Sequence, residues 1–323
     1  MAGIEIANFA KHLIKGPGAR TWLDKTMAGY IPKPGRIALT PMLTDKGRLY
    51  GDLTVACYSD EHFMLFGSGA MQDAHSRWFK RTLPDDVMHE NQTGDWHGIA
   101  LSGPESRKLL SGITRDDVSN DAFKFRDTRQ TYVGSVPVLL NRLSFSGEVG
   151  YEIYCRPQYL LRLAEAIEEA GNELNYRWYG NRALMSLRLE KAWGAWSLEF
   201  RPDFNAIESG MEGFINWNKD FIGKEATQKI KEAGVVRRLV TLVIDTPIDV
   251  TLDEAIMKDG NAVGYVSSGG YTHYVGKSMA MGYVESAYAT PGTQLEVEII
   301  GEFYPAVVQG PPLYDPDGER MRS

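Results

Sequence analysis

The chain has 323 residues, of which 43% are hydrophobic and 24% charged, with a formal net charge of −7 at pH 7. This length can bury a sizeable core and predicts two or more compact units. The negative charge argues against a general affinity for nucleic acid. No apolar run approaches the roughly 20 residues of a membrane span, which argues against a membrane protein.

The two cysteines, Cys57 and Cys155, lie far apart in apolar strand patterns. They are expected to be small core residues in a reducing compartment rather than a disulfide pair. The N-terminus carries no secretory signal pattern. We therefore expect a cytoplasmic protein, or one of the mitochondrial matrix if the chain comes from a eukaryotic precursor.

The first part of the chain alternates strand patterns with short helices. Residues 4–15 favour strand, and a Gly-Pro turn then leads into a helix. Two later strands flank the hairpin turn Asp45-Lys46-Gly47. The expected strands are 36–43, 48–58, 62–67, 96–102 and 125–140; the expected helices are 20–28, 70–80 and a short helix ending at 110.

The stretch 141–155 reads NRLSFSGEVGYEIYC and is expected to form a strand, a turn at Ser146-Gly147, and a second strand. Period-two alternation places Glu152 and Tyr154 on one side of the second strand. A helix should open at Pro157 and end near Gly171. A further helix is expected over residues 183–192.

After residue 233 the composition shifts to short strand runs separated by Gly, Pro and Asp. Such spacing is typical of a small β-barrel. We therefore divide the chain into residues 1–233 and a C-terminal β-barrel domain of residues 234–323.

Two carboxylates stand out within strand patterns. Glu152 lies in mid-strand between tyrosines, and if it is shielded from water it needs a donor-rich partner. Asp52 follows Gly51 and precedes inward-alternating residues. The pattern alone also allows an exposed glutamate on a solvent face and an aspartate that only makes a local turn.

Four motifs in order carry a family resemblance: LTPMLTDKGRLYGDLTV (39–55), SFSGEVGYEIY (144–154), LRLEKAWGAW (187–196) and INWNKDFIGKEA (215–226). They resemble the folate-binding aminomethyltransferase (glycine cleavage T-protein) family. The KGPGA opening, RLEKA and DFIGKEA look most like the C-terminal folate domain of dimethylglycine and sarcosine dehydrogenases. The resemblance implies an α+β, multi-lobed fold of antiparallel sheets and helices around a folate channel, with a C-terminal β-barrel.

The resemblance also implies site residues and a cofactor, tetrahydrofolate. Asp52 matches the family aspartate that approaches N10 of tetrahydrofolate, where it assists proton transfer. Glu152 matches the glutamate that accepts hydrogen bonds from the pterin N–H and exocyclic amino group. Tyr154 shares its face and is expected to stack on, or hydrogen-bond to, the ring.

Three further positions depart from the family pattern or have a second interpretation. Phe145 stands where T-proteins usually have tyrosine, which leaves only stacking. Ser68 lies near a position where T-proteins carry an asparagine that lines the folate site. Arg188 could reach the folate carboxylate tail, although a structural salt bridge explains it equally well.

Several motifs are missing, and this bears on the reaction. The sequence has no HExxH or paired metal spacing, so we expect no metal site. GSGAMQD fails the GxGxxG dinucleotide pattern, so no flavin domain is expected and any oxidation must occur elsewhere.

We therefore expect a transferase that captures an iminium or formaldehyde from an oxidised N-methyl amine and forms 5,10-methylenetetrahydrofolate. Its partners would be a small-molecule one-carbon donor and a flavin-containing dehydrogenase domain or subunit.

Three alternatives remain open. One is a tetrahydrofolate-dependent demethylase of a sulfonium or an aryl methyl ether. Another is the glycine-cleavage aminomethyltransferase, which receives its unit from a lipoyl carrier. The last is a folate-binding protein without catalysis.

Overall fold

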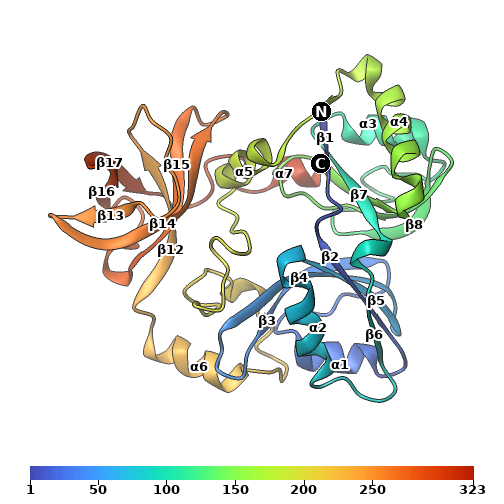
Figure 1. The fold of residues 1–323 in the computed structure, drawn as a ribbon, viewed down its shortest axis with the longest axis horizontal. Coiled ribbons are helices and arrows are strands. Elements are labelled where there is room, and N and C mark those ends of the chain that lie inside the picture. Colours follow the sequence, from blue (N-terminus) through green and yellow to red (C-terminus); the bar gives the residue numbers. More distant parts are fainter.

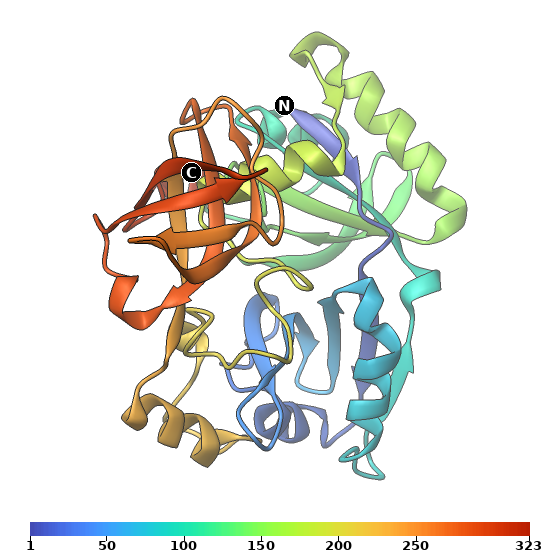
Figure 2. The same ribbon diagram turned by 60° about the vertical axis from the view of Figure 1, so that its left-hand side comes forward.

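The computed structural model describes residues 1–323 and shows three lobes, two built on open sheets with helices and one on a barrel (Figures 1 and 2). The expected α+β, multi-lobed fold is confirmed. Both chain ends lie at the first lobe (Figure 1). No helix is both long enough and apolar enough to cross a membrane.

The first lobe is a six-stranded sheet that is antiparallel except for one parallel edge pair. Its strands, in spatial order, are β11 (Arg177–Trp178), β1 (Ala2–Glu5), β7 (His97–Ser102), β10 (Gly150–Cys155), β9 (Val136–Asn141) and β8 (Thr128–Val133). Helices α3 (Ser106–Ile113) and α4 (Leu160–Gly171) cover one face. Their leucines and isoleucine share a buried cluster with Tyr151 and Ile153 of β10.

The second lobe is an antiparallel five-stranded sheet with α1 (Ala19–Thr26) and α2 (Gln72–Lys80) on one face. Its strands, in spatial order, are β3 (Arg36–Leu43), β4 (Leu49–Ser59), β5 (His62–Gly67), β2 (Ala10–Lys15) and β6 (Met88–Asn91). The strands β2 to β5 and both helices follow the sequence-based expectation. The short edge strand β6 was not anticipated, because MHEN carries no apolar alternation.

The other faces of the two sheets meet in one apolar layer. Ala56 of β4, Phe66 of β5 and Tyr154 of β10 belong to the same buried cluster. Because side chains alternate along a strand, Asp52 shares the face of Ala56, and Glu152 shares the face of Tyr154. Both carboxylates therefore project toward the space between the sheets.

The third lobe is a closed barrel, which confirms the expected C-terminal β-barrel. Its strands are β12 (Arg237–Ile244), β15 (Lys277–Glu285), β14 (Asn261–Thr272), β13 (Ala255–Lys258), β16 (Gln294–Ile299) and β17 (Glu302–Val308). The remaining helices are α5 (Asn181–Glu190), α6 (Lys224–Ala233) and α7 (Glu319–Arg322). Short 3₁₀ turns are η1 (Gly69–Met71), η2 (Thr93–Asp95), η3 (Pro157–Tyr159), η4 (Asn172–Leu174), η5 (Glu212–Phe214) and η6 (Ser286–Tyr288).

The division at residue 234 remains a prediction. It lies between the end of α6 and the start of β12. Beyond the barrel, however, the chain returns to the first lobe, where Arg142 donates hydrogen bonds to the carbonyl oxygens of Arg322 and Ser323.

The strand expected over residues 141–145 is wrong. β9 ends at Asn141, β10 begins at Gly150, and the chain between them is a loop. The fully buried Arg142 side chain turns inward, where it donates to the Phe123 carbonyl and to Asn120 Oδ1. This anchor takes the chain out of the sheet, and Gly147 turns it with a positive φ of 86°.

Candidate active site

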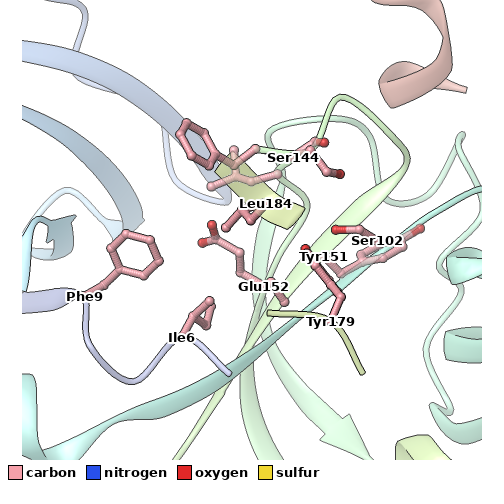
Figure 3. A pocket seen from close by; sticks show the side chains of 12 residues that line it. Ile6, Phe9, Ser102, Ser144, Tyr151, Glu152, Tyr179 and Leu184 are labelled. Carbon is pink, nitrogen blue, oxygen red and sulfur yellow. The ribbon is translucent and has the colours of Figure 1, made fainter. Parts of the chain in front are cut away.

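Glu152 sits in the middle of β10 and faces a narrow cavity in the first lobe (Figure 3). Its strand neighbours Tyr151 and Ile153 pack against α3 and α4, so Glu152 takes the opposite face. The cross-strand neighbours of Glu152 are Ala100 on β7 and Asn141 on β9. The expected alternation in β10 is confirmed, and Glu152 is not on an open solvent face.

The cavity contains about 350 Å³ of empty space, part of it open to solvent, and the centre of a water molecule can reach only about 30 Å³ of it. It is therefore a small cavity, which we call the slot. Figure 3 shows the Glu152 carboxylate entering it beside Phe9 and Ile6. The lining residues are Ile6, Phe9, Ala100, Ser102, Leu143, Ser144, Phe145, Ser146, Tyr151, Glu152, Tyr179 and Leu184.

The Glu152 carboxylate has one hydrogen-bonded neighbour, the Tyr154 hydroxyl, 3.1 Å from Oε2. Burial raises the pKa of Glu152 to about 7, against the opposing effects of that hydrogen bond and the charge of Lys11. The Asn141 side chain, opposite Glu152 on β9, also opposes this shift. The Tyr179 hydroxyl, on a residue that lines the slot, has no well-formed hydrogen bond and is available to a polar ligand.

Asp52 lies on β4, opposite Pro41 of β3. Proline has no N–H, so this neighbour offers the aspartate no backbone donor. Burial raises the pKa of Asp52 to about 7. Just before it, the Tyr50 carbonyl lies 2.8 Å from His75 Nε2, which fixes the local backbone. A partly buried carboxylate that titrates near neutrality can both accept and return a proton.

The structure brings only part of the expected site to the slot. Phe145 lines it, with its ring stacked on Trp193 at a centroid distance of 6.3 Å. Tyr154 is only 1% exposed, packs against Phe66 and does not line the slot. Ser68 follows β5 without a side-chain hydrogen bond to its helical turn and does not line the slot.

Arg188 lies outside the slot altogether. Its side chain is fully buried, and Nη1 bonds Glu199 Oε2 at 2.8 Å. Glu199 also accepts from Ser267 and Ser268 of β14. The guanidinium therefore joins α5 to the barrel, which agrees with the structural-salt-bridge interpretation and leaves it no access to a folate tail.

Sequence reasoning did not identify Lys11, which has no exposed surface. A lysine within AKHLIK is expected at a solvent face, and nothing local indicates its burial. Tyr179 was also missed, because it lies outside every motif. No group of three or more His, Cys, Asp or Glu side chains is placed to hold a metal ion.

Two opposed sheets with inward carboxylates, joined to a barrel, define the class of fold. The chain matches the GCVT N-terminal domain over residues 1–219 and the glycine cleavage T-protein C-terminal barrel domain over residues 237–315. It belongs to this family. The aminomethyltransferases of this family bind tetrahydrofolate, so the expected cofactor is confirmed, and the family supports the expected class of folate-dependent transferase.

Individual relatives agree with this placement. The chain is 39% identical to human mitochondrial dimethylglycine dehydrogenase over all of its own length, but it spans only 38% of that protein. It is 30% identical to an aminomethyltransferase of Desulfitobacterium hafniense, covering 92% of the chain and 82% of that protein. The structure of aminomethyltransferase T from Bartonella henselae superposes with a TM-score of 0.88 at 22% identity, covering 98% of this chain and 86% of that one, and so shares the fold.

Proposed function

We propose that the chain transfers a one-carbon unit from an oxidised N-methyl amine to tetrahydrofolate and so forms 5,10-methylenetetrahydrofolate. The observation that carries this proposal is the pair of carboxylates, Asp52 and Glu152, on the facing sides of two sheets. Burial brings the pKa of each to about 7. Two groups of that kind suit different tasks, one binding a planar ring and one moving a proton.

The residues that line the slot support pterin binding. The two oxygens of the Glu152 carboxylate can each accept from one of two adjacent N–H groups of a ring edge, because the Tyr154 hydroxyl uses only one acceptor position of Oε2. Phe145 offers an apolar ring surface at the same slot. Tetrahydrofolate supplies two amine nitrogens, N5 and N10, which come to share the carbon.

Asp52 is proposed as the catalytic residue. In transfer from an iminium, the carbon loses its double bond to the donor nitrogen and forms single bonds to N5 and N10 of tetrahydrofolate. The N–H bonds of N5 and N10 break. One proton passes to the leaving amine and the other to solvent. Asp52 accepts the N10 proton and returns it, and its near-neutral pKa favours both steps.

The oxidation of the donor is assigned to another domain or subunit. Human dimethylglycine dehydrogenase, whose name describes an oxidation, is more than twice as long as the stretch that this chain matches. We therefore propose a flavin-containing dehydrogenase domain or subunit as the partner and a small N-methylated amine as the donor. We place the protein in a reducing compartment, the cytoplasm or the mitochondrial matrix, because its two cysteines are free and buried.

Binding and product formation test this function. Calorimetry should show binding of 5-formyltetrahydrofolate, an oxidation-resistant analogue, and Glu152→Gln should weaken it by about 2–4 kcal/mol. Glu148→Gln, in the adjoining loop but not lining the slot, is the matched control. Product formation from tetrahydrofolate and formaldehyde should exceed the uncatalysed background. Binding without any catalysis would instead favour a folate-binding protein, and turnover with a sulfonium alone would favour a demethylase.

A further inference from the structure

We infer that Lys11 is a positioning residue that acts through Glu152: a buried cation that keeps this carboxylate ionised for the bound pterin. The inference rests on the proposed function, because it assumes that Glu152 receives the ring. It assigns a role to a side chain that no motif marks. Lys11 would touch neither ligand nor reacting atoms.

The environment of Lys11 is unusual for a lysine. The residue has no exposed surface, and no carboxylate oxygen lies within 4.0 Å of Nζ. Its ammonium donates one hydrogen bond, to the Ala7 carbonyl at 2.7 Å. A buried ammonium without an ion pair is costly to fold, so an apolar residue would suit this position better if stability alone mattered.

A short chain of contacts connects Lys11 to the slot. Lys11 on β2 is the cross-strand partner of Phe66 on β5. Its Nζ lies 5.6 Å from the centre of the Tyr154 ring, and that ring stacks on Phe66. The Tyr154 hydroxyl in turn meets the Glu152 carboxylate. The cation is thus linked to Glu152 through Tyr154, and it does not line the slot.

This separation suits ligand binding. A direct ion pair would occupy the carboxylate oxygens of Glu152. A cation that makes no direct contact still stabilises the ionised carboxylate and leaves one oxygen free for the ligand. In agreement, burial lowers the pKa of Lys11 to about 8, and the charges of Glu5 and Glu152 oppose that effect. The charge of Lys11 also opposes the upward shift of the Glu152 pKa.

The test measures binding as a function of pH. Calorimetry with 5-formyltetrahydrofolate would compare the parent chain with Lys11→Met, and with Lys11→Gln in case the methionine variant does not fold. The groups facing this site are Glu5 on β1, Tyr58 on β4, and Glu152 and Tyr154 on β10. Of these, we expect Glu152 to set the pH at which affinity reaches half its maximum, near pH 7.

Without the cation, Glu152 should ionise less readily. The pH at which affinity reaches half its maximum should rise by about one unit, so affinity at pH 7 should fall several-fold and recover at higher pH. The ligand-free variant should melt at the same temperature as the parent or higher. Lys15→Met removes a cation from the end of the same strand and should leave the midpoint unchanged.

Each outcome decides one question. A parent chain that binds no folate would overturn the proposed function itself. Normal binding by the parent, with Lys11→Met equal to it at every pH while Glu152→Gln fails, would overturn only the role of Lys11. Weaker binding by Lys11→Met at every pH without a shifted midpoint would assign Lys11 to packing and also overturn the inference.

Discussion

The hydroxyl of Tyr154 lies 3.1 Å from Oε2 of Glu152, two residues away on the same strand. The tyrosine ring stacks on Phe66 with a centroid distance of 4.6 Å and an interplanar angle of 24°. Because its ring face is already covered, Tyr154 cannot offer it to a pterin. It orients the carboxylate instead.

Removing the Tyr154 hydroxyl should therefore weaken folate binding without loosening the fold. In Tyr154→Phe the stacked ring remains, but Glu152 loses the hydroxyl donor on its own strand. A hydrogen bond to a charged group contributes about 1.5–3 kcal/mol, so the dissociation constant should rise by roughly tenfold or more. Calorimetry measures this directly.

Tyr176→Phe is the matched control, because it also deletes a buried tyrosine hydroxyl, but one that has no hydrogen-bond partner and lies away from the slot. Equal affinities for Tyr154→Phe and the parent would show that Tyr154 only fills space between the sheets.

The sequence predicted those features of the fold and the site that are set by the pattern within a single strand or helix. The alternation in YEIYC predicted the face of Glu152, because that face is set within one strand. The packing of Tyr154 could not be predicted, since its partner Phe66 lies on the other sheet. The burial of Lys11 and the Glu199 partner of Arg188 likewise depend on residues distant in sequence. Strand propensity also failed beyond Asn141, where a buried arginine takes the chain out of the sheet.

Asp52→Asn should slow product formation while folate binding survives. The amide keeps the shape and one acceptor of the carboxylate but cannot take up the N10 proton. General acid–base assistance is typically worth about 10²–10⁴-fold, so the rate above background should fall within that range. Single-turnover formation of 5,10-methylenetetrahydrofolate is the measurement.

The control for this variant is Asp45→Asn, in the exposed turn between β3 and β4. It should leave the rate unchanged. If Asp52→Asn matched the parent after subtraction of the formaldehyde background, Asp52 would have no part in proton transfer. Catalysis would then rest on proximity alone.

Arg188→Met should destabilise the protein rather than alter folate affinity. It leaves the fully buried Glu199 without its cation, and breaking a buried pair costs about 3–5 kcal/mol. We expect a lower thermal midpoint, with the dissociation constant of the folded fraction unchanged. Arg182→Met, which breaks an exposed pair with Asp249, should have little effect. A well-folded Arg188→Met with selectively weaker folate binding would restore the carboxylate-tail interpretation.

The histidine pair between β2 and β6 should make the protein acid-sensitive. His12 Nδ1 lies 3.2 Å from His89 Nε2. Burial, followed by the neighbouring histidines, lowers the pKa of His12 to about 3. Burial and the charge of Lys80 lower the pKa of His89 to about 4, against the opposing charge of Glu90. Both values lie below the ordinary 6.5, so the unfolded chain takes up these protons first as pH falls. The stability that the neutral pair contributes is complete above about pH 6.5 and is lost progressively toward pH 4.

His89→Gln removes one of these titrations while retaining a group that can bond His12. Comparing pH 7.5 with pH 5, the variant should lose about 1 kcal/mol less unfolding free energy than the parent, a figure reduced for the partial exposure of His89. Thermal midpoints at both pH values measure the difference.

The raised pKa values of Asp52 and Glu152 act in the opposite sense, because their contribution to stability is present at low pH and is lost as pH rises through 7. They are common to both proteins and cancel in the comparison. His273→Gln, in the exposed turn between β14 and β15, is the control. If His89→Gln and the parent lost the same stability, the pair would not be the acid-labile element.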